Sequence, residues 1–427
     1  MMRKRARAGW LPVLGLLLSV LPTYAQNDIA ARVGIYHWLG KAPAAATAAG
    51  GDEMTAALPD LQRFGVGTVR VFVGGRYDYL HPKNSPQRFS EIEGPVRLAK
   101  ILALPRYRQL FENPQFRTVW LTAYPVHDYG GGPDEIDLRR RVSGREWKQE
   151  ARQMREMVEW LYQNFSESDK VVLLSNHEAD EKLREILDAG ADPKLALDNV
   201  VRNLRTRFEA VEAARRKFPR ARLKVLFGVE IALRQLRLRR TANGTYEKTT
   251  EGLNALESVL PRLRYDFVSF SSWEAMGRKD VDRALREALE DINRRTRGGL
   301  TNAGKKQFGD RPVLVGEFGY SRQWSFSPGI LESWLAAMVS VVRDALVPYA
   351  VYWQLYDDME GGGEFGLIDP EGNLTQTGRA FLELLRRPPA GHSTAIVTMS
   401  EVAPPMRSTT GTAGPVGASA GTGTLTW

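Results

Sequence analysis

Short apolar runs recur along the chain, separated by segments long enough for a helix. Eight runs rich in β-branched and aromatic residues have the length of a strand, and they cover residues 33–38, 68–73, 118–124, 171–175, 223–229, 267–271, 313–317 and 349–355. Because most are apolar throughout, they are typical of strands that are buried on both faces. The pattern therefore predicts a parallel sheet covered by helices.

The segments between these runs carry the spacing of amphipathic helices. The clearest helix is predicted over 147–165, and Ser143 with Glu146 forms a capping box before it. A second helix is predicted over 197–218, and a third opens at Ser327-Pro328. Strands that alternate with helices form parallel units, and eight units close most economically into a single (β/α)8 barrel.

A doubly wound open sheet is the competing architecture. Its usual Gly-x-Gly-x-x-Gly turn is missing after Tyr36-His37-Trp38, where the chain is rich in alanine. The barrel is therefore favoured, and we expect it to occupy residues 26–387. Residues 388–427 are rich in Gly, Ala, Ser, Thr and Pro, so we predict a disordered tail of low complexity.

The first 25 residues have the pattern of a signal peptide. A basic lead precedes the apolar run 10–21, and Thr23-Tyr24-Ala25 ends it with a small residue at the predicted cut. No later segment approaches the ~20 apolar residues of a membrane helix, so we expect no stable membrane insertion after cleavage. We predict a secreted or periplasmic protein.

Charge and cysteine content narrow the function classes. Four of the positive charges lie in the predicted signal peptide, which leaves +5 of the formal +9, so nucleic acid is not an expected partner. The chain contains no cysteine, which excludes disulfides and thiolate chemistry. The stability of the fold must therefore come from its hydrophobic core and not from disulfide cross-links.

Two of the apolar runs deliver a glutamate to the carboxyl end of a predicted strand. Glu317 ends the seventh run and Glu178 follows the fourth, and this is the end at which barrels hold their active sites. Glycosidic bond cleavage with retention needs two carboxyl groups about 5–5.5 Å apart. We therefore predict a glycoside hydrolase, with Glu230 and Glu274 on the fifth and sixth runs as rival carboxylates.

Four motifs occur in the order and spacing of a known clan. They are Thr68-Val69-Arg70-Val71, Asn176-His177-Glu178, Gly316-Glu317-Phe318-Gly319 and the aromatic stretch 351–358. Together they resemble the retaining glycoside hydrolases of the cellulase and β-mannanase type, which carry catalytic glutamates on strands four and seven of a TIM barrel. The resemblance implies that Glu317 is the nucleophile and Glu178 the acid/base. It also implies that Arg70 holds Glu317 ionised and that Trp353 floors the subsite where the bond breaks.

The chain departs from that clan at two places. His177 stands where most of these families have asparagine, with Asn176 one residue earlier, and this is similar to the β-mannanase branch. The sixth run lacks the tyrosine that often contacts the nucleophile, and we expect Trp273 to pack or stack in its place. These departures, including Ser272 in the sixth run, leave open a barrel that binds carbohydrate without cleaving it.

Three of the five histidines, His37, His127 and His177, fall at the ends of predicted strands. They could contact sugar hydroxyls, or they could bind a metal in a metal-dependent hydrolase. Such barrels usually carry a denser ligand set on the first strand, so we expect no metal and no organic cofactor. The predicted substrate-binding residues are Arg70, His37, Trp38, His127, Asn176, His177, Trp273 and Trp353.

These observations predict an exported retaining glycoside hydrolase that cleaves β-linked poly- or oligosaccharides by double displacement. Transglycosylation at the same site is left open.

Overall fold

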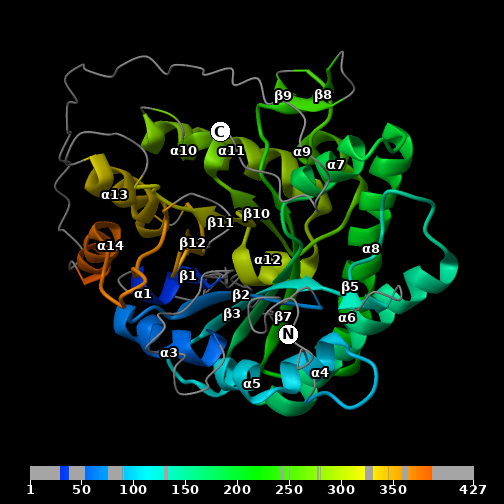
Figure 1. Ribbon diagram of the computed structural model, residues 1–427, viewed down its shortest axis with the longest axis horizontal. Coiled ribbons are helices and arrows are strands. Elements are labelled where there is room, and N and C mark those ends of the chain that lie inside the picture. Colours follow the sequence, from blue (N-terminus) through cyan, green and yellow to red (C-terminus); the bar gives the residue numbers. More distant parts are fainter. Residues whose placement is uncertain are drawn as a thin grey trace, which may run out of the picture.

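Eight parallel strands close into a barrel in the computed structural model (Figure 1). Around the barrel the strand order is β1-β12-β11-β10-β7-β6-β3-β2, and each neighbouring pair is parallel. All eight predicted runs are confirmed as strands. Their bounds are β1 (Val33–His37), β2 (Thr68–Gly74), β3 (Thr118–Tyr124), β6 (Val171–Ser175), β7 (Lys224–Ile231), β10 (Phe267–Ser271), β11 (Val313–Phe318) and β12 (Ala350–Trp353).

The structure describes residues 29–37, 53–75, 89, 91–128, 133–241, 245–249, 251–276, 278, 280–322, 330–344, 346–357 and 364–386. The predicted signal peptide, Trp38, the helix start at Ser327-Pro328 and the predicted tail lie outside these residues. In the described ranges, no helix is long and apolar enough to cross a bilayer.

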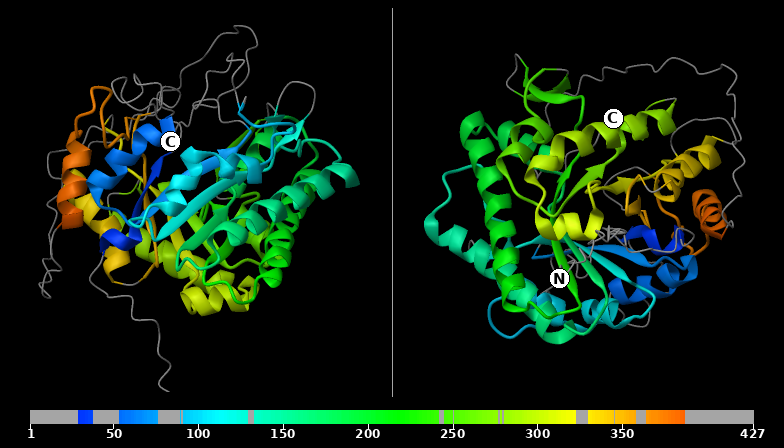
Figure 2. Two further views of the ribbon diagram at one scale, coloured as in Figure 1. Left: turned by 90° about the horizontal axis from the view of Figure 1, so that it is seen from below. Right: turned by 180° about the vertical axis from the view of Figure 1, so that it is seen from behind.

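Helices surround the barrel in all three views (Figures 1 and 2). They are α1 (Ile29–Arg32), α3 (Glu53–Phe64), α4 (Leu98–Ala103), α5 (Pro105–Glu112), α6 (Gly144–Phe165), α7 (Ala179–Asp188), α8 (Pro193–Lys217), α9 (Ala255–Ser258), α10 (Trp273–Met276), α11 (Val281–Thr296), α12 (Asn302–Phe308), α13 (Ile330–Arg343) and α14 (Gln376–Arg386). Two short hairpins, β4 (His127–Asp128) with β5 (Pro133–Asp134) and β8 (Arg237–Arg240) with β9 (Tyr246–Thr249), follow strands β3 and β7.

Local sequence signals explain where the two longest helices begin. The predicted capping box is present at α6, where the Ser143 hydroxyl accepts a hydrogen bond from the Glu146 N–H and the Glu146 carboxylate accepts one from the Ser143 N–H. Helix α8 begins four residues before the predicted range, because Asp192 caps it and Pro193 occupies its first position.

Both faces of the barrel strands are buried, which explains why the runs are apolar throughout. Alternate residues face opposite sides of a strand, so Phe267 packs inside the barrel while Val268 packs under the helices. The side chains that face the barrel interior change from apolar to polar toward the carboxyl ends of the strands. Along β7 the inward series begins with Leu226 and reaches Glu230, and along β10 it begins with Phe267 and reaches Ser269. The barrel is therefore apolar at its base and polar at its mouth.

A test of this interior packing is the variant Gly228→Ala. A methyl group at Gly228 would lie 2.3 Å from the ring of Phe267, which is fully buried inside the barrel. We expect a loss of about 1–3 kcal/mol in the free energy of unfolding, because an overpacked core must shift its side chains. Urea denaturation measures it. Gly144→Ala, at a site with no atom within 4 Å, is the matched control; equal stability of the two variants would contradict this packing.

Candidate active site

The centre of the barrel mouth is a buried ion pair between Arg70 of β2 and Glu230 of β7. Both guanidinium Nη atoms lie 2.8 Å from a Glu230 oxygen, and both side chains are fully buried. Arg70 also donates to the Thr122 hydroxyl at 3.0 Å and to the Gly316 carbonyl at 2.9 Å. Ser269 donates to Glu230 at 2.5 Å. Strands β3, β10 and β11 therefore supply hydrogen-bonding groups around the Arg70–Glu230 pair.

A bulge in β11 places Glu317 beside this pair. The pairing of β10 with β11 shifts between Phe270 and Ser271, so that Ser271 lies opposite Glu317 instead of Gly316. Such a bulge re-aims the side chain that follows it. One oxygen of Glu317 then lies 3.6 Å from Arg70 Nη1, and the other accepts a hydrogen bond from the Trp273 indole at 3.2 Å.

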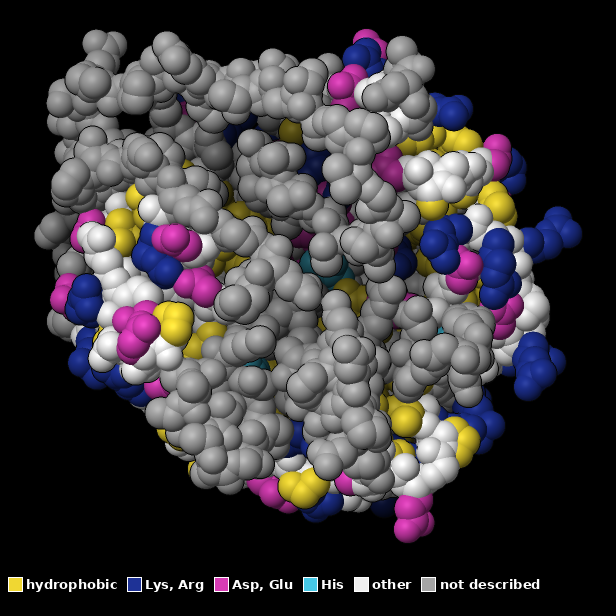
Figure 3. Space-filling view, in the orientation of Figure 1, with side chains coloured by type: hydrophobic (Ala, Val, Ile, Leu, Met, Phe, Trp, Pro, Cys, Tyr) yellow, Lys and Arg dark blue, Asp and Glu magenta, His cyan; other side chains and the backbone are white. Residues whose placement is uncertain are grey.

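Glu178 lies three residues after the end of β6, at the N-cap position of α7, and is only 4% exposed. One carboxylate oxygen each from Glu178 and Glu317 and one ring nitrogen of His177 all lie within 4.8 Å of one another. This separation agrees with the spacing that retaining glycosidases need between their carboxyl groups. Figure 3 shows histidine and acidic side chains near the centre of this face.

Burial and mutual repulsion raise the pKa of both glutamates. Desolvation contributes most for Glu178, followed by the negative charges of Glu317, Glu181 and Glu230, and its pKa lies well above the usual range. Burial and the charge of Glu230 raise the pKa of Glu317 to about 8. We expected Arg70 to hold Glu317 ionised. Its two-point contact is instead with Glu230, so Arg70 only partly offsets this rise.

The surrounding groups favour different protonation states for Glu317 and Glu178. Glu317 has the positive charge of Arg70 and the Trp273 indole beside it, and both favour its ionised form. Within the described residues, no hydrogen bond or ion pair reaches the Glu178 carboxylate. When the pair carries one proton, the environment therefore places it on Glu178.

The two rival carboxylates, Glu230 and Glu274, bind other groups of the protein. Both oxygens of Glu230 contact Arg70, and its side chain has no exposed surface. Glu274 accepts hydrogen bonds from the backbone N–H groups of Arg234, Gln235 and Leu236, so it holds the loop that follows β7. Neither belongs to the group that brings Glu178, Glu317 and His177 together.

Three other predicted substrate-binding residues lie at strand ends around the mouth. His37 ends β1, is fully buried and packs edge-on against the Tyr356 ring at 5.7 Å. Trp353 ends β12, is half-buried and packs against Tyr36 at 5.1 Å between ring centres. His177 is also half-buried and lies beside the glutamates.

Two predicted substrate-binding residues are bonded to the protein itself. The Asn176 amide accepts a hydrogen bond from the Glu230 N–H and donates to the Glu230 carbonyl, so it ties β6 to β7. His127 is 1% exposed and lies 2.8 Å from Glu150 of α6, which in turn binds Arg207 of α8. His127 therefore lies between the barrel and these two helices, and direct contact with a sugar is not supported for it.

The described histidines do not form the predicted alternative metal site. The potential ligand group that the described residues bring together is His177, Glu178 and Glu317, without His37 or His127. Two of these three are the paired carboxylates already described. Sequence reasoning missed Thr122 and Ser269, although each is an isolated polar residue inside an apolar run.

Comparisons with solved structures identify the fold. No family model matches this sequence, and no curated protein matches it. The GH1 β-glucosidase from Exiguobacterium antarcticum B7 is 13% identical, with a TM-score of 0.51 over 83% of this chain and 97% of that chain. A family 1 β-glucosidase from Thermotoga maritima is 14% identical, with a TM-score of 0.50 over 83% of this chain and 97% of that chain.

An exo-β-1,4-mannosidase from Opitutaceae bacterium strain TAV5 is 17% identical, with a TM-score of 0.49. The match covers 83% of this chain but only 59% of that chain. At these identities, the similarity to the two β-glucosidases establishes the barrel fold alone.

The raised pKa of Glu317 predicts how its removal changes stability with pH. The folded state retains a proton that the unfolded state loses between pH about 4.5 and 8, so wild-type stability falls as pH rises through this window. Glutamine has no proton to lose. We therefore expect Glu317→Gln to raise the melting temperature relative to wild type, by an amount that grows from pH 5 to 8.

Melting temperatures measured across that range test the expectation. Glu287→Gln, at an exposed position of α11, is the control and should shift the melting temperature equally at every pH. A pH-independent effect of Glu317→Gln would show that Glu317 titrates like an ordinary glutamate.

Proposed function

We propose that this protein is an exported retaining glycoside hydrolase that cleaves β-linked poly- or oligosaccharides. The observation that carries the proposal is the pair of buried carboxylates, Glu178 and Glu317, which have one oxygen each within 4.8 Å of the other at the barrel mouth. The same fold occurs in two β-glucosidases, so the barrel can host this chemistry.

In the first step, an ionised oxygen of Glu317 attacks the anomeric carbon of the bound sugar. Glu178 gives its proton to the glycosidic oxygen, and the bond from that oxygen to the anomeric carbon breaks. The sugar stays attached to Glu317 as an ester. Burial of Glu178 near other carboxylates supports its role as the acid, because it keeps the proton until the leaving oxygen accepts it.

In the second step, Glu178 acts as the base. It takes a proton from water as the water oxygen attacks the anomeric carbon, and the ester bond to Glu317 breaks. Glu178 is again protonated and Glu317 is again ionised, so the site returns to its starting state. The indole of Trp273 donates to Glu317 and stabilises the carboxylate that leaves the sugar. No metal or organic cofactor is required.

Export is part of the proposal and rests on the basic lead and apolar run in residues 1–25. Around the glutamates, His177 and Trp353 are half-buried, so both can contact a sugar hydroxyl or a sugar face. His37 and Arg70 are fully buried, so their proposed role is to support the side chains around the subsite.

Replacing either glutamate should abolish turnover of β-linked polymers. We expect Glu317→Gln to reduce kcat by on the order of a thousandfold or more, because the covalent step is lost. Reducing-sugar release from β-mannan, xylan, cellulose, mixed-linkage glucan and β-1,3-glucan measures it, with Glu287→Gln as the control. Full activity in Glu317→Gln would refute the assignment, and no release from any polymer by wild type would favour a binding barrel.

A separate prediction concerns the role of Glu178. An aryl glycoside carries a leaving group that departs without protonation, so Glu178→Gln should lose about a hundredfold less activity on it than on the natural polymer. Proton NMR of the first product should show retained anomeric configuration. An inverted product, or equal losses on both substrates, would exclude Glu178 as the general acid of a retaining mechanism.

A further inference from the structure

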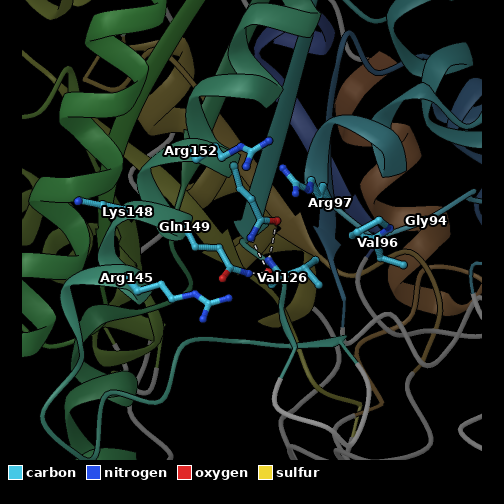
Figure 4. A pocket seen from close by; sticks show the side chains of 10 residues that line it. Gly94, Val96, Arg97, Val126, Arg145, Lys148, Gln149 and Arg152 are labelled. Atoms are coloured by element: carbon cyan, nitrogen blue, oxygen red, sulfur yellow. Dashed lines mark hydrogen bonds between the residues drawn. The ribbon is translucent and has the colours of Figure 1, made fainter.

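A basic cavity lies at the mouth end of the barrel, outside the glutamate pair. It has a volume of about 560 Å³ and lies between the start of α4 and the first turns of α6, beside the loop that follows β3. Figure 4 shows residues of α6 on one side and those near α4 on the other. Its lining residues are Gly94, Pro95, Val96, Arg97, Val126, Arg145, Lys148, Gln149, Arg152 and Gln153.

Four of these side chains are cations. One carboxylate, that of Glu156, pairs with Arg97 at 3.3 Å and with Arg152 at 2.6 Å. Arg145 and Lys148 are exposed, and within the described part of the chain neither forms a hydrogen bond or an ion pair. Two positive charges therefore remain available to an anion in the cavity.

The wall behind these cations is fixed. Gln153 accepts a hydrogen bond from the Val126 N–H at 3.0 Å, and Gln149 donates to the Val126 carbonyl at 3.1 Å. These bonds tie the loop after β3 to α6. The cations lie on α6 and on the segment before α4, and they line a cavity whose volume lies within the range of about 300–1,000 Å³ typical of small-molecule sites.

The position of the cavity relative to Glu178 indicates which kind of ligand could bind there. Strands β2, β3 and β6 are neighbours in the barrel, and Glu178 follows β6 while the cavity lies beyond the ends of β2 and β3. The proposed path takes a polymer from the catalytic pair across the end of β3 to this cavity. Guanidinium and ammonium groups favour carboxylate and sulfate groups, and a small cluster of cations lacks the long basic stripe of a nucleic-acid surface.

We propose that this cavity is an outer subsite for a negatively charged sugar, so that the substrate is a β-linked glycan bearing carboxylate or sulfate groups. The inference rests on the proposed function and deepens it. The acidic residues at the catalytic pair would repel such a group, so the charged sugar binds at the rim while an uncharged unit occupies the site of cleavage.

The test uses the full chain carrying Glu317→Gln, so that no polymer is consumed. We would measure Kd by calorimetry for a polyuronate, a sulfated galactan and a neutral mannan of matched length. Adding Arg145→Ala with Lys148→Ala should weaken binding of an anionic glycan about tenfold, since each exposed contact between opposite charges contributes roughly a factor of three. Binding of the mannan should not change.

The control is Arg155→Ala, an exposed cation on the same helix that does not line the cavity. It should leave every Kd unchanged, and Arg145→Lys should retain most of the binding. The two anionic glycans distinguish carboxylate from sulfate recognition, and loss of either one in the double variant supports the subsite. Unchanged Kd values in the double variant, or a stronger cation-dependent affinity for duplex DNA or anionic vesicles, would overturn it.

This outcome is separable from that of the proposed function. Hydrolysis of neutral polymers without cation-dependent binding of an anionic glycan would refute the subsite and leave the glycosidase intact. Cation-dependent binding without hydrolysis of any glycan would refute the glycosidase and leave a binding site for anionic sugars.

Discussion

The mouth of this barrel depends on one buried guanidinium, that of Arg70. A buried charge is tolerated only when it is paired and hydrogen-bonded, because removing it from water costs several kcal/mol. Glu230 supplies the opposite charge, and the Thr122 hydroxyl and the Gly316 carbonyl accept further hydrogen bonds from the guanidinium. These contacts join β2 to β3, β7 and β11. Groups from three other strands therefore surround one cation.

That arrangement also explains the properties of the glutamate pair. Since Glu230 takes the two-point contact with Arg70, Glu317 shares the positive charge only at 3.6 Å and has a raised pKa. Within the described residues no hydrogen bond or ion pair reaches the Glu178 carboxylate, and burial and the nearby carboxylates raise its pKa well above the usual range. Two chemically identical side chains thus have different surroundings, as the proposed roles of acid and nucleophile require.

Charge is divided between two parts of the mouth. The centre is acidic and buried, whereas the rim between α4 and α6 is basic and open. Both parts follow from the same architecture, because strand ends and helix starts meet at one end of a (β/α)8 barrel. In the proposed function, the strand ends carry the catalytic glutamates and the helix starts carry the outer subsite.

The sequence by itself determined the strands, the two longest helices and the two candidate glutamates. Burial on both faces makes a strand apolar throughout, and caps such as Ser143 mark helix starts, so these signals are local. Only the tertiary structure decided that Arg70 pairs with Glu230, that Asn176 and His127 bond to the protein, and that a bulge aims Glu317 at the mouth. Barrel closure joins residues up to 246 positions apart around Arg70, and local periodicity carries no information about such partners.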